Sequence, residues 1–345
     1  MNLDRLPPDP FSYSAALARG VTRQQLRTAV RLGHLYSPAR GWYARAGEAH
    51  EIAERWEVIR ADHLRRLDMA LHTYRGAVAS HDSAAIVHGL PLMVSPRAEV
   101  HLVHVEDYPT SRRLPGVILH HADSGPTQVE EVDGRRVTSA ARAAADVMRT
   151  RRVPHSLAML DQALRERTLT LEEVEATLAG QRRWVGKTRA REVLSLVDVR
   201  RESWAESFSY GVLAAADLPL PIPQVEVLDE GFDFAARVDG FLEGYNAYFE
   251  VHGLGKFFIG TFASEPDETE RMVRARVEAE ESRIERLGRL GLAGAEWTAD
   301  EALRSPEVVP RRMLRAMEQG EQQTFTGWVR WEGRICRPPL LPRAA

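Results

Sequence analysis

Acidic side chains inside two apolar segments constrain the fold of this chain more than any other feature of its sequence. Asp239 follows the segment Ala235–Val238, and Glu250 lies in the middle of Tyr248–His252. Both segments are typical of β-strands, and burying a carboxylate without a partner is costly. We therefore expect the two carboxylates to share a partner, and a divalent cation that favours oxygen ligands fits that role. A metal ion held in this way indicates phosphodiester chemistry.

The chain is long enough for more than one domain. Its 345 residues predict two or three domains, and a hydrophobic content of 44% indicates that they are globular. The 46 basic residues nearly balance the 49 acidic residues, so any surface for nucleic acid has to be local. A lone cysteine, Cys336, excludes a disulfide framework or a cysteine metal cage within one chain.

The sequence has no segment that is typical of export or of a membrane span. Residues Met1–Pro7 lack the basic and apolar regions of a signal peptide. No apolar run approaches the roughly 20 residues that a membrane-spanning helix needs. We expect a cytoplasmic protein with no membrane partner.

Residues 1–48 predict a winged helix-turn-helix domain. A helix over Phe11–Ala18 precedes a second helix that Thr22 caps, and strands at 34–37 and 42–45 then form a hairpin. In this layout the second helix enters the major groove of double-stranded DNA and the hairpin contacts the backbone. Arginine and glutamine are the residue types that read base edges. The candidate DNA contacts are Arg23, Gln24, Arg27, Arg31 and Arg40. A small helical lid with a solvated arginine face is the alternative.

Three short motifs in this segment resemble the winged-helix domain of the AbiEi antitoxin family. They are Val21–Leu26, Leu32–Leu35 and Arg40–Tyr43. Proteins of that family are transcriptional autorepressors of type IV toxin–antitoxin systems, which act in abortive infection. The resemblance implies binding to double-stranded DNA. It makes a cognate toxin a candidate partner. A second copy of the chain, in a homodimer, is another candidate.

Residues 49–150 predict an α/β domain. A long amphipathic helix is expected over Glu51–Arg75, and Ser80 is expected to cap a short helix. The remaining expected elements are strands at Glu99–Val105, Val117–His120 and Val129–Val132 and a helix at Ala140–Arg149. This segment resembles the second domain of the same antitoxin family, through motifs at Ser80–Ala85, His88–Leu90, His101–Val103 and Val137–Ser139. The resemblance implies a role in interactions and DNA contact.

Half of the 12 histidines lie between His81 and His121. Side chains alternate along a strand, so His101 and His104 face opposite sides, and the adjacent His120 and His121 diverge. We therefore interpret these histidines as structural or surface residues and not as metal ligands.

Residues 151–200 predict a helical connector with a local basic cluster. The cluster consists of Arg182, Arg183, Lys187, Arg189 and Arg191. A solvated helix face and a stripe that contacts a nucleic-acid backbone are both open interpretations.

Residues 201–320 predict a helix, a three-strand meander, a helix and a strand. The expected elements are Glu202–Asp217, Gln224–Leu228, Ala235–Leu242, Tyr245–Val251, a helix from Ser264 to about Leu290, and Ala295–Trp297. This αβββαβ order resembles the PD-(D/E)XK nuclease fold of very-short-patch-repair-type endonucleases. The matching motifs are Ala205–Ser207, Gln224, Arg237–Asp239 and Glu250–Phe257.

The resemblance implies a site in which Asp239, Glu250 and Glu206 hold Mg²⁺ or Mn²⁺. The implied catalytic residues are Glu206, Asp239, Glu250, His252 and Lys256. Lys256 is implied to position water or to stabilise the transition state. His252 departs from the pattern, because the subgroup has an aspartate there. Gly240 replaces a more usual aromatic or apolar residue, and Glu280, Glu281 and Glu285 replace basic ones.

The predicted class is a multidomain α+β protein with an N-terminal winged helix-turn-helix, an α/β middle domain and a restriction-endonuclease-like C-terminal domain. The expected segments are 1–48, 49–150, 151–200, 201–320 and a poorly ordered or strapping tail at 321–345. The expected function is that of a DNA-binding defence protein whose C-terminal domain, if active, is a Mg²⁺-dependent DNA endonuclease. The alternative is a non-catalytic AbiEi-like repressor with a decayed nuclease fold.

Overall fold

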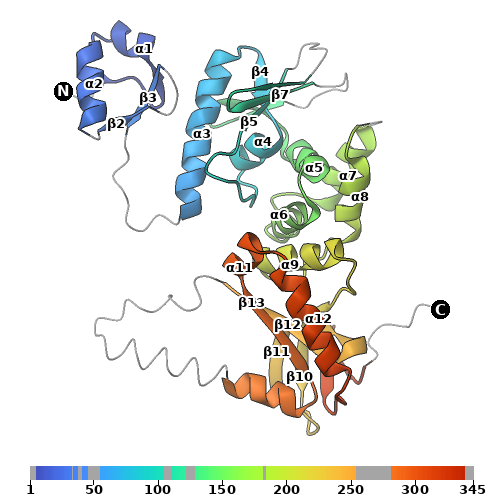
Figure 1. Cartoon of the computed structure of the whole chain (residues 1–345). Helices are drawn as coiled ribbons and strands as arrows, with labels where there is room; N and C mark the ends of the chain where they lie inside the picture. Colours follow the sequence, from blue (N-terminus) through green and yellow to red (C-terminus); the bar gives the residue numbers. More distant parts are fainter. Residues whose placement is uncertain are drawn as a thin grey trace. The chain divides into compact units, whose positions relative to one another are not determined.

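The computed structural model describes residues 5–32, 34–37, 41–45, 55–104, 111–121, 129–181, 184–253 and 281–338. The chain divides into two compact units, each made of two stretches of sequence. Unit 1 is Met1–Arg151 with Arg167–Ala190, and unit 2 is Arg152–Glu166 with Arg191–Ala345. Both units combine helices with sheets (Figure 1). The expected multidomain α+β class is therefore confirmed at this level.

Unit 1 begins with two short helices and a hairpin. The elements are β1 (Phe11–Ser12), α1 (Tyr13–Ala18), α2 (Arg23–Arg31), β2 (Leu35–Tyr36) and β3 (Trp42–Arg45), and the strand order is β1-β3-β2. Thr22 caps α2 as expected, in a reciprocal capping box with Gln25. The start of the first expected helix is instead a strand, because Phe11 and Ser12 pair with β3. Leu26 and Leu35 pack in the core beneath α2.

A second, mixed sheet forms the rest of unit 1. Its strands are β4 (Ala77–Ala79), β5 (Val100–His104), β6 (Arg112–Leu114), β7 (Val117–His120), β8 (Val129–Val132) and β9 (Arg135–Thr138), in the order β6-β7-β5-β4-β9-β8. The helices are α3 (Arg55–Thr73), α4 (His81–Val87) and α5 (Ala140–Thr150). Figure 1 shows α3 beside this sheet, where it contacts β4 and β5. Ser80 lies at the cap of α4, but its side chain makes no capping hydrogen bond.

The residues of the expected helical connector at 151–200 are divided between the two units. Its helices are α6 (Val153–Arg165), α7 (Leu171–Gly180) and α8 (Lys187–Ser195). The helix α6 belongs to unit 2 and α7 belongs to unit 1, where α7 packs on α5. The boundary between the units falls inside α8. Sequence spacing identified the helices but not the sheets and helices against which each of them packs.

Unit 2 is built on one sheet with parallel and antiparallel neighbours. Its strands are β10 (Ile222–Leu228), β11 (Phe234–Leu242), β12 (Ala247–His252), β13 (Ala293–Thr298), β14 (Trp328–Trp331) and β15 (Arg334–Cys336), in the order β13-β12-β11-β10-β14-β15. The meander β10–β11–β12 is antiparallel, and β13 pairs with β12 in parallel. Besides α6, the helices are α9 (Trp204–Ala215), η2 (Glu243–Tyr245), a helix over residues 281–289, α11 (Ala299–Arg304) and α12 (Val308–Gly320).

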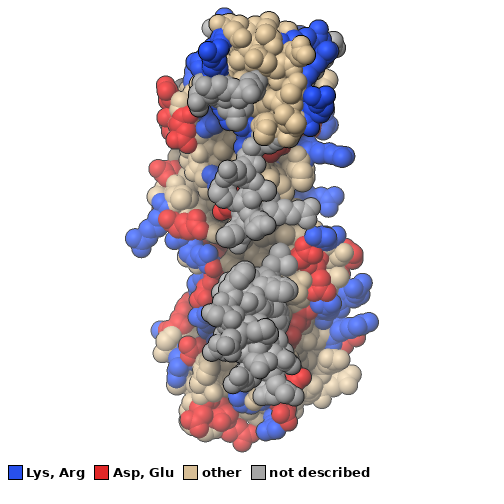
Figure 2. Space-filling model, turned by 90° about the vertical axis from the view of Figure 1, so that its left-hand side faces the viewer, with Lys and Arg blue, Asp and Glu red and all other residues tan. Residues whose placement is uncertain are grey.

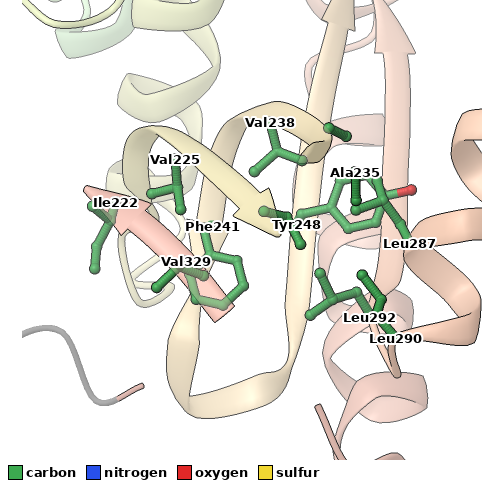
Figure 3. Packing of buried hydrophobic residues seen from close by; sticks show 12 residues of the cluster. Ile222, Val225, Ala235, Val238, Phe241, Tyr248, Leu287, Leu290, Leu292 and Val329 are labelled. Carbon is green, nitrogen blue, oxygen red and sulfur yellow. The ribbon is translucent and has the colours of Figure 1, made fainter. Parts of the chain in front are cut away.

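One apolar cluster holds the meander together. Figure 3 shows side chains of the strands, among them Val225, Phe241 and Tyr248, gathered with Leu287 of the helix over residues 281–289. All four are at most 1% exposed. The expected order of helix, meander, helix and strand is present within the described residues. The part of the expected Ser264–Leu290 helix before residue 281 lies outside them.

The segment 321–345 is not a tail in its described part. Strand β14 pairs with β10, and β15 pairs with β14, so both extend the sheet. Val329 of β14 is fully buried in the same cluster as Phe241. The prolines at 338, 339 and 342 suggested an unstructured end, whereas Trp328–Trp331 form a strand. None of the helices in the described ranges is long and apolar enough to cross a membrane.

Candidate functional site

Asp239 and Glu250 lie on neighbouring antiparallel strands, as their sequence context predicts. The ladder between β11 and β12 runs through the pair Gly240 and Phe249. Beyond it, the Asp239 carboxylate accepts a hydrogen bond from the backbone N–H of Val251, at 2.8 Å. The side chain of Asp239 therefore takes the place of a backbone acceptor at the end of the ladder.

Glu206 joins Asp239 through a shared glutamine. The N-terminal turn of α9 holds Glu206, whose backbone N–H donates to the capping hydroxyl of Ser203. The side-chain amide of Gln224 on β10 lies 2.8 Å from a carboxylate oxygen of Glu206 and 3.4 Å from one of Asp239. Burial raises the pKa of Glu206, and the nearby charge of Asp239 raises it further. This close pair of carboxylates could hold a cation.

The third expected ligand, Glu250, has a different partner. Its carboxylate forms a close ion pair with Arg283 from the helix over residues 281–289. His252 does not face Glu250 either, because its Nε2 lies 3.3 Å from a carboxylate oxygen of Glu296 on β13. The hydrogen bond from His252 lowers the pKa of Glu296. Both partners lie far from Glu250 and His252 in the sequence, and local spacing could not predict them.

The described residues fit the expected Mg²⁺ or Mn²⁺ site only in part. Glu206 and Asp239 converge, but Glu206, Asp239 and Glu250 do not form a group whose ligand atoms all lie within 4.8 Å of one another. The positive charge of the Arg283 guanidinium beside Glu250 also disfavours binding of a metal cation at that carboxylate. Glu206 and Asp239 therefore meet at Gln224, while Glu250 pairs with Arg283. Lys256, the expected catalytic lysine, lies outside the described residues.

The candidate DNA contacts on α2 share an exposed surface. Arg23, Gln24, Arg27 and Arg31 are all exposed, while Leu26 and Ala29 on the opposite face are buried. Within the described part of the chain none of these arginines has an acidic side chain within ion-pair distance. Figure 2 shows where Lys and Arg side chains, in blue, lie on one face of the structure. The fifth candidate, Arg40, lies outside the described residues.

The basic cluster after α7 includes side chains with structural partners. The guanidinium of Arg189 donates to the backbone carbonyls of Arg149 and Thr150, at 3.0 and 3.3 Å. The ammonium of Lys187 lies 3.3 Å from the carbonyl of Gln181. These contacts satisfy carbonyl groups at the ends of α5 and α7. For Lys187 and Arg189 they favour a structural role over a nucleic-acid contact, while Arg182 and Arg183 lie outside the described residues.

Sequence reasoning missed a cluster of three histidines in unit 1. His81 begins α4, His101 lies on β5 and His120 lies on β7, and one nitrogen from each lies within 4.8 Å of the others. The Nδ1 of His101 and the Nε2 of His120 are 3.0 Å apart, and the rings of His81 and His120 stack at 3.6 Å. Burial lowers the pKa of all three imidazoles, that of His120 to about 3, and so favours their neutral form.

The cluster arises from strand register and not from spacing along one strand. His101 is opposite Ile118, and His120 is opposite Val103, so the two histidines are diagonal neighbours on one face of the β5–β7 pair. The comparison of His101 with His104 considered only one strand. A prediction of the parallel β5–β7 pairing is the signal that could have found the cluster.

The two units and their side-chain clusters define a multidomain α+β protein with separate mixed sheets. The uncharacterized protein Rv2248 of Mycobacterium tuberculosis (strain ATCC 25618 / H37Rv) is 34% identical over 213 residues, which cover 61% of this chain and 71% of the relative. MT2308 of strain CDC 1551 / Oshkosh, also uncharacterized, matches to the same extent. The chain belongs to the family of these mycobacterial proteins.

Comparison with models of known protein families gives no match. Among solved structures, the crystal structure of the Rv2827c protein from Mycobacterium tuberculosis is similar over 64% of this chain and 80% of its own. The sequence identity is 18% and the TM-score is 0.35.

Proposed function

We propose that the chain is a DNA-binding protein of the AbiEi antitoxin type, acting as a transcriptional regulator in bacterial defence. In this proposal α2 and the β2–β3 hairpin form a winged helix that contacts double-stranded DNA. The observation that carries the proposal is the exposed face of α2. A cognate toxin is the protein partner that the family resemblance suggests.

The charges on α2 are arranged unfavourably for an isolated helix. Arg23, Arg27 and Arg31 are four residues apart, so they are neighbours on one face of the helix. Like charges at this spacing cost about 0.2–0.5 kcal/mol per pair. A polyanion that binds this face removes the repulsion, and a helix of this width fits the major groove. The buried side of α2 meanwhile fixes its orientation through Leu26.

Binding to the DNA upstream of the protein's own gene tests the proposal, measured by fluorescence anisotropy over a range of salt concentrations. We expect Arg27→Ala and Arg31→Ala each to weaken binding. Each should also lower the slope of log affinity against log salt by about 1, if the arginine contacts a phosphate. Arg304→Ala is the matched control, because Arg304 is an exposed helical arginine of unit 2 that pairs with Asp300. Unchanged affinity and salt slope in both α2 variants would refute the assignment of α2.

A second candidate function is metal-dependent hydrolysis of DNA, and the Glu206–Gln224–Asp239 contact favours it. Glu206 and Asp239 would hold the ion, and Gln224 would orient both carboxylates. A bound Mg²⁺ or Mn²⁺ supplies an activated water and stabilises charge on the phosphate. The pairing of Glu250 with Arg283 argues against this candidate, so we favour the regulator that does not cleave DNA.

Supercoiled DNA incubated with the protein and Mg²⁺ or Mn²⁺ distinguishes the two functions. We expect no metal-dependent nicking by the wild type. Nicking that disappears in both Asp239→Ala and Glu206→Ala would replace the non-catalytic proposal with a nuclease. Nicking that survives both changes would point to a contaminant or to another site. Circular dichroism and urea denaturation measured in parallel show that each variant remains folded.

A further inference from the structure

We propose that His81, His101 and His120 form a binding site for a transition-metal ion, most simply Zn²⁺, in the first unit. Three imidazoles from three different elements converge there, with their candidate ligand atoms within 4.8 Å of one another. Imidazole nitrogen suits Zn²⁺ and the neighbouring transition metals, whereas Mg²⁺ favours oxygen. The site is therefore separate in place and in chemistry from the carboxylates of unit 2.

The spacing of two of the nitrogens is close to that around a bound ion. The Nδ1 of His101 and the Nε2 of His120 are 3.0 Å apart. Two nitrogens at about 2.0–2.1 Å from a tetrahedral Zn²⁺ lie about 3.3 Å from each other. An ion can therefore replace the shared proton with a small movement. The ring of His81, now stacked 3.6 Å from that of His120, would tilt to direct a nitrogen at the ion.

Carboxylates face the other nitrogens of two of these rings. An oxygen of Asp146 lies 3.7 Å from the Nδ1 of His81. An oxygen of Asp82 lies 3.9 Å from the Nε2 of His101, the nitrogen opposite the one that faces His120. Both distances are longer than a hydrogen bond. At zinc sites a carboxylate commonly accepts a hydrogen bond from the far nitrogen of a ligating histidine, which fixes the ring and raises its basicity, and both carboxylates lie on the side where a small ring movement would form that bond. A cluster that is only packed together does not require this arrangement.

Arginines hold both carboxylates in place. Asp146 is fully buried between Arg142 and Arg149, and Asp82 pairs with Arg151. One oxygen of Asp82 is buried without a hydrogen-bond partner among the described residues. The arginines offset the two carboxylate charges, so the affinity of the site comes from the three imidazoles and not from a surplus of negative charge. An all-nitrogen ligand set of this kind discriminates against alkaline-earth cations.

The backbone at His81 keeps its imidazole next to the other two before binding, so that only the ring has to tilt. His81 has a positive φ of 49°, a conformation that L residues rarely adopt, at the junction between β4 and α4. Its Nδ1 also lies 3.1 Å from the hydroxyl of Ser80. The junction directs this imidazole over the face of the sheet that carries the other two.

Titration of the full-length, metal-free protein with ZnCl₂ and CoCl₂ tests the proposal. We expect one ion per chain by calorimetry, and the intense visible absorption of tetrahedral Co²⁺. His120→Gln and His101→Gln should each weaken Zn²⁺ binding by at least about 100-fold, because changes that only touch a ligand's partner typically cost about 10- to 100-fold. Asp82→Asn should weaken it by about 10-fold or more for that reason.

His104→Gln is the matched control, because His104 lies on the same strand as His101 and faces the opposite side. Cys336→Ser excludes the thiol as a ligand. Both should bind Zn²⁺ as the wild type does, and circular dichroism should show that every variant is folded. Free Zn²⁺ at 100 times its dissociation constant should favour the folded wild type by about 100-fold, which appears as a higher Tm. No binding by the wild type, or equal binding by His120→Gln and His104→Gln, overturns the proposal.

Discussion

A contact between two neighbouring strands explains why residue 240 is a glycine. It is paired with Phe249, and a Cβ atom at position 240 would lie 2.2 Å from the ring of Phe249. That ring is fully buried and stacks on Trp297 with centroids 5.0 Å apart. The ring cannot move aside, so glycine is required there. Packing against Phe249 thus explains why glycine stands here in place of an apolar residue.

We expect Gly240→Ala to lower the free energy of unfolding by about 1–3 kcal/mol, the usual cost of overpacking a core. Urea denaturation followed by circular dichroism measures this. Gly244→Ala is the control, because a Cβ there meets no atom within 4 Å, and it should change stability by less than about 0.5 kcal/mol. Equal stability of the two variants would show that the Phe249 ring is not fixed against β11.

Other single residues show what a sequence leaves undecided. The context of Asp239 indicated a buried, partnered carboxylate, and the structure gives it the N–H of Val251 and the amide of Gln224. The same reasoning predicted a metal ion as the partner of Glu250. Its carboxylate instead pairs with Arg283, which lies 33 residues further along the chain. A carboxylate that needs a positive partner does not specify which one, because an ion and a guanidinium satisfy it similarly.

At the scale of elements, those with strong local signals were predicted well. Thr22 caps α2 as expected, and α2 begins directly after it. Thr170 caps α7 in the same local way, with Glu173 completing a capping box. The meander β10–β11–β12 also lies where alternation and turn residues predicted it. Such elements are specified by contacts within a few residues.

The elements that sequence reasoning missed depend on partners distant in the sequence. Strand β4 has three buried residues, too few to show an alternation, and it exists because β5 and β9 pair with it. Strands β14 and β15 follow a helix and precede several prolines, and they form because β10 leaves an edge open. Short strands gain stability from pairing and not from local preference.

At the scale of the whole molecule, neither unit is a continuous stretch of sequence. The first part of unit 2, Arg152–Glu166, contains α6, which packs on α9. Gly211 of α9 permits this contact, because a Cβ there would lie 2.5 Å from the Cα of Pro154. Asp161 of α6 also forms a buried ion pair with Arg201. The segment between the two parts of unit 2 belongs to unit 1.

Truncation tests this arrangement. A fragment of residues 191–345 lacks α6 and leaves Arg201 without its buried partner, at a cost of about 3–5 kcal/mol from the broken pair alone. We expect this fragment to unfold at a clearly lower urea concentration than a fragment of residues 152–345, which retains α6. Tryptophan fluorescence and circular dichroism measure both transitions. Equal midpoints would mean that α6 does not belong to the folded core of unit 2.

The sequence by itself determined the α+β structural class, the caps and periodicity of the main helices, the meander, and which carboxylates need partners. The tertiary structure alone decided which partners those carboxylates take, where α6, α7 and the last strands belong, and that three histidines meet. Caps, turns and alternation act between residues a few positions apart and can be read along the chain. Strand register, ion pairs and histidine clusters join residues far apart, and their energies depend on the whole packing.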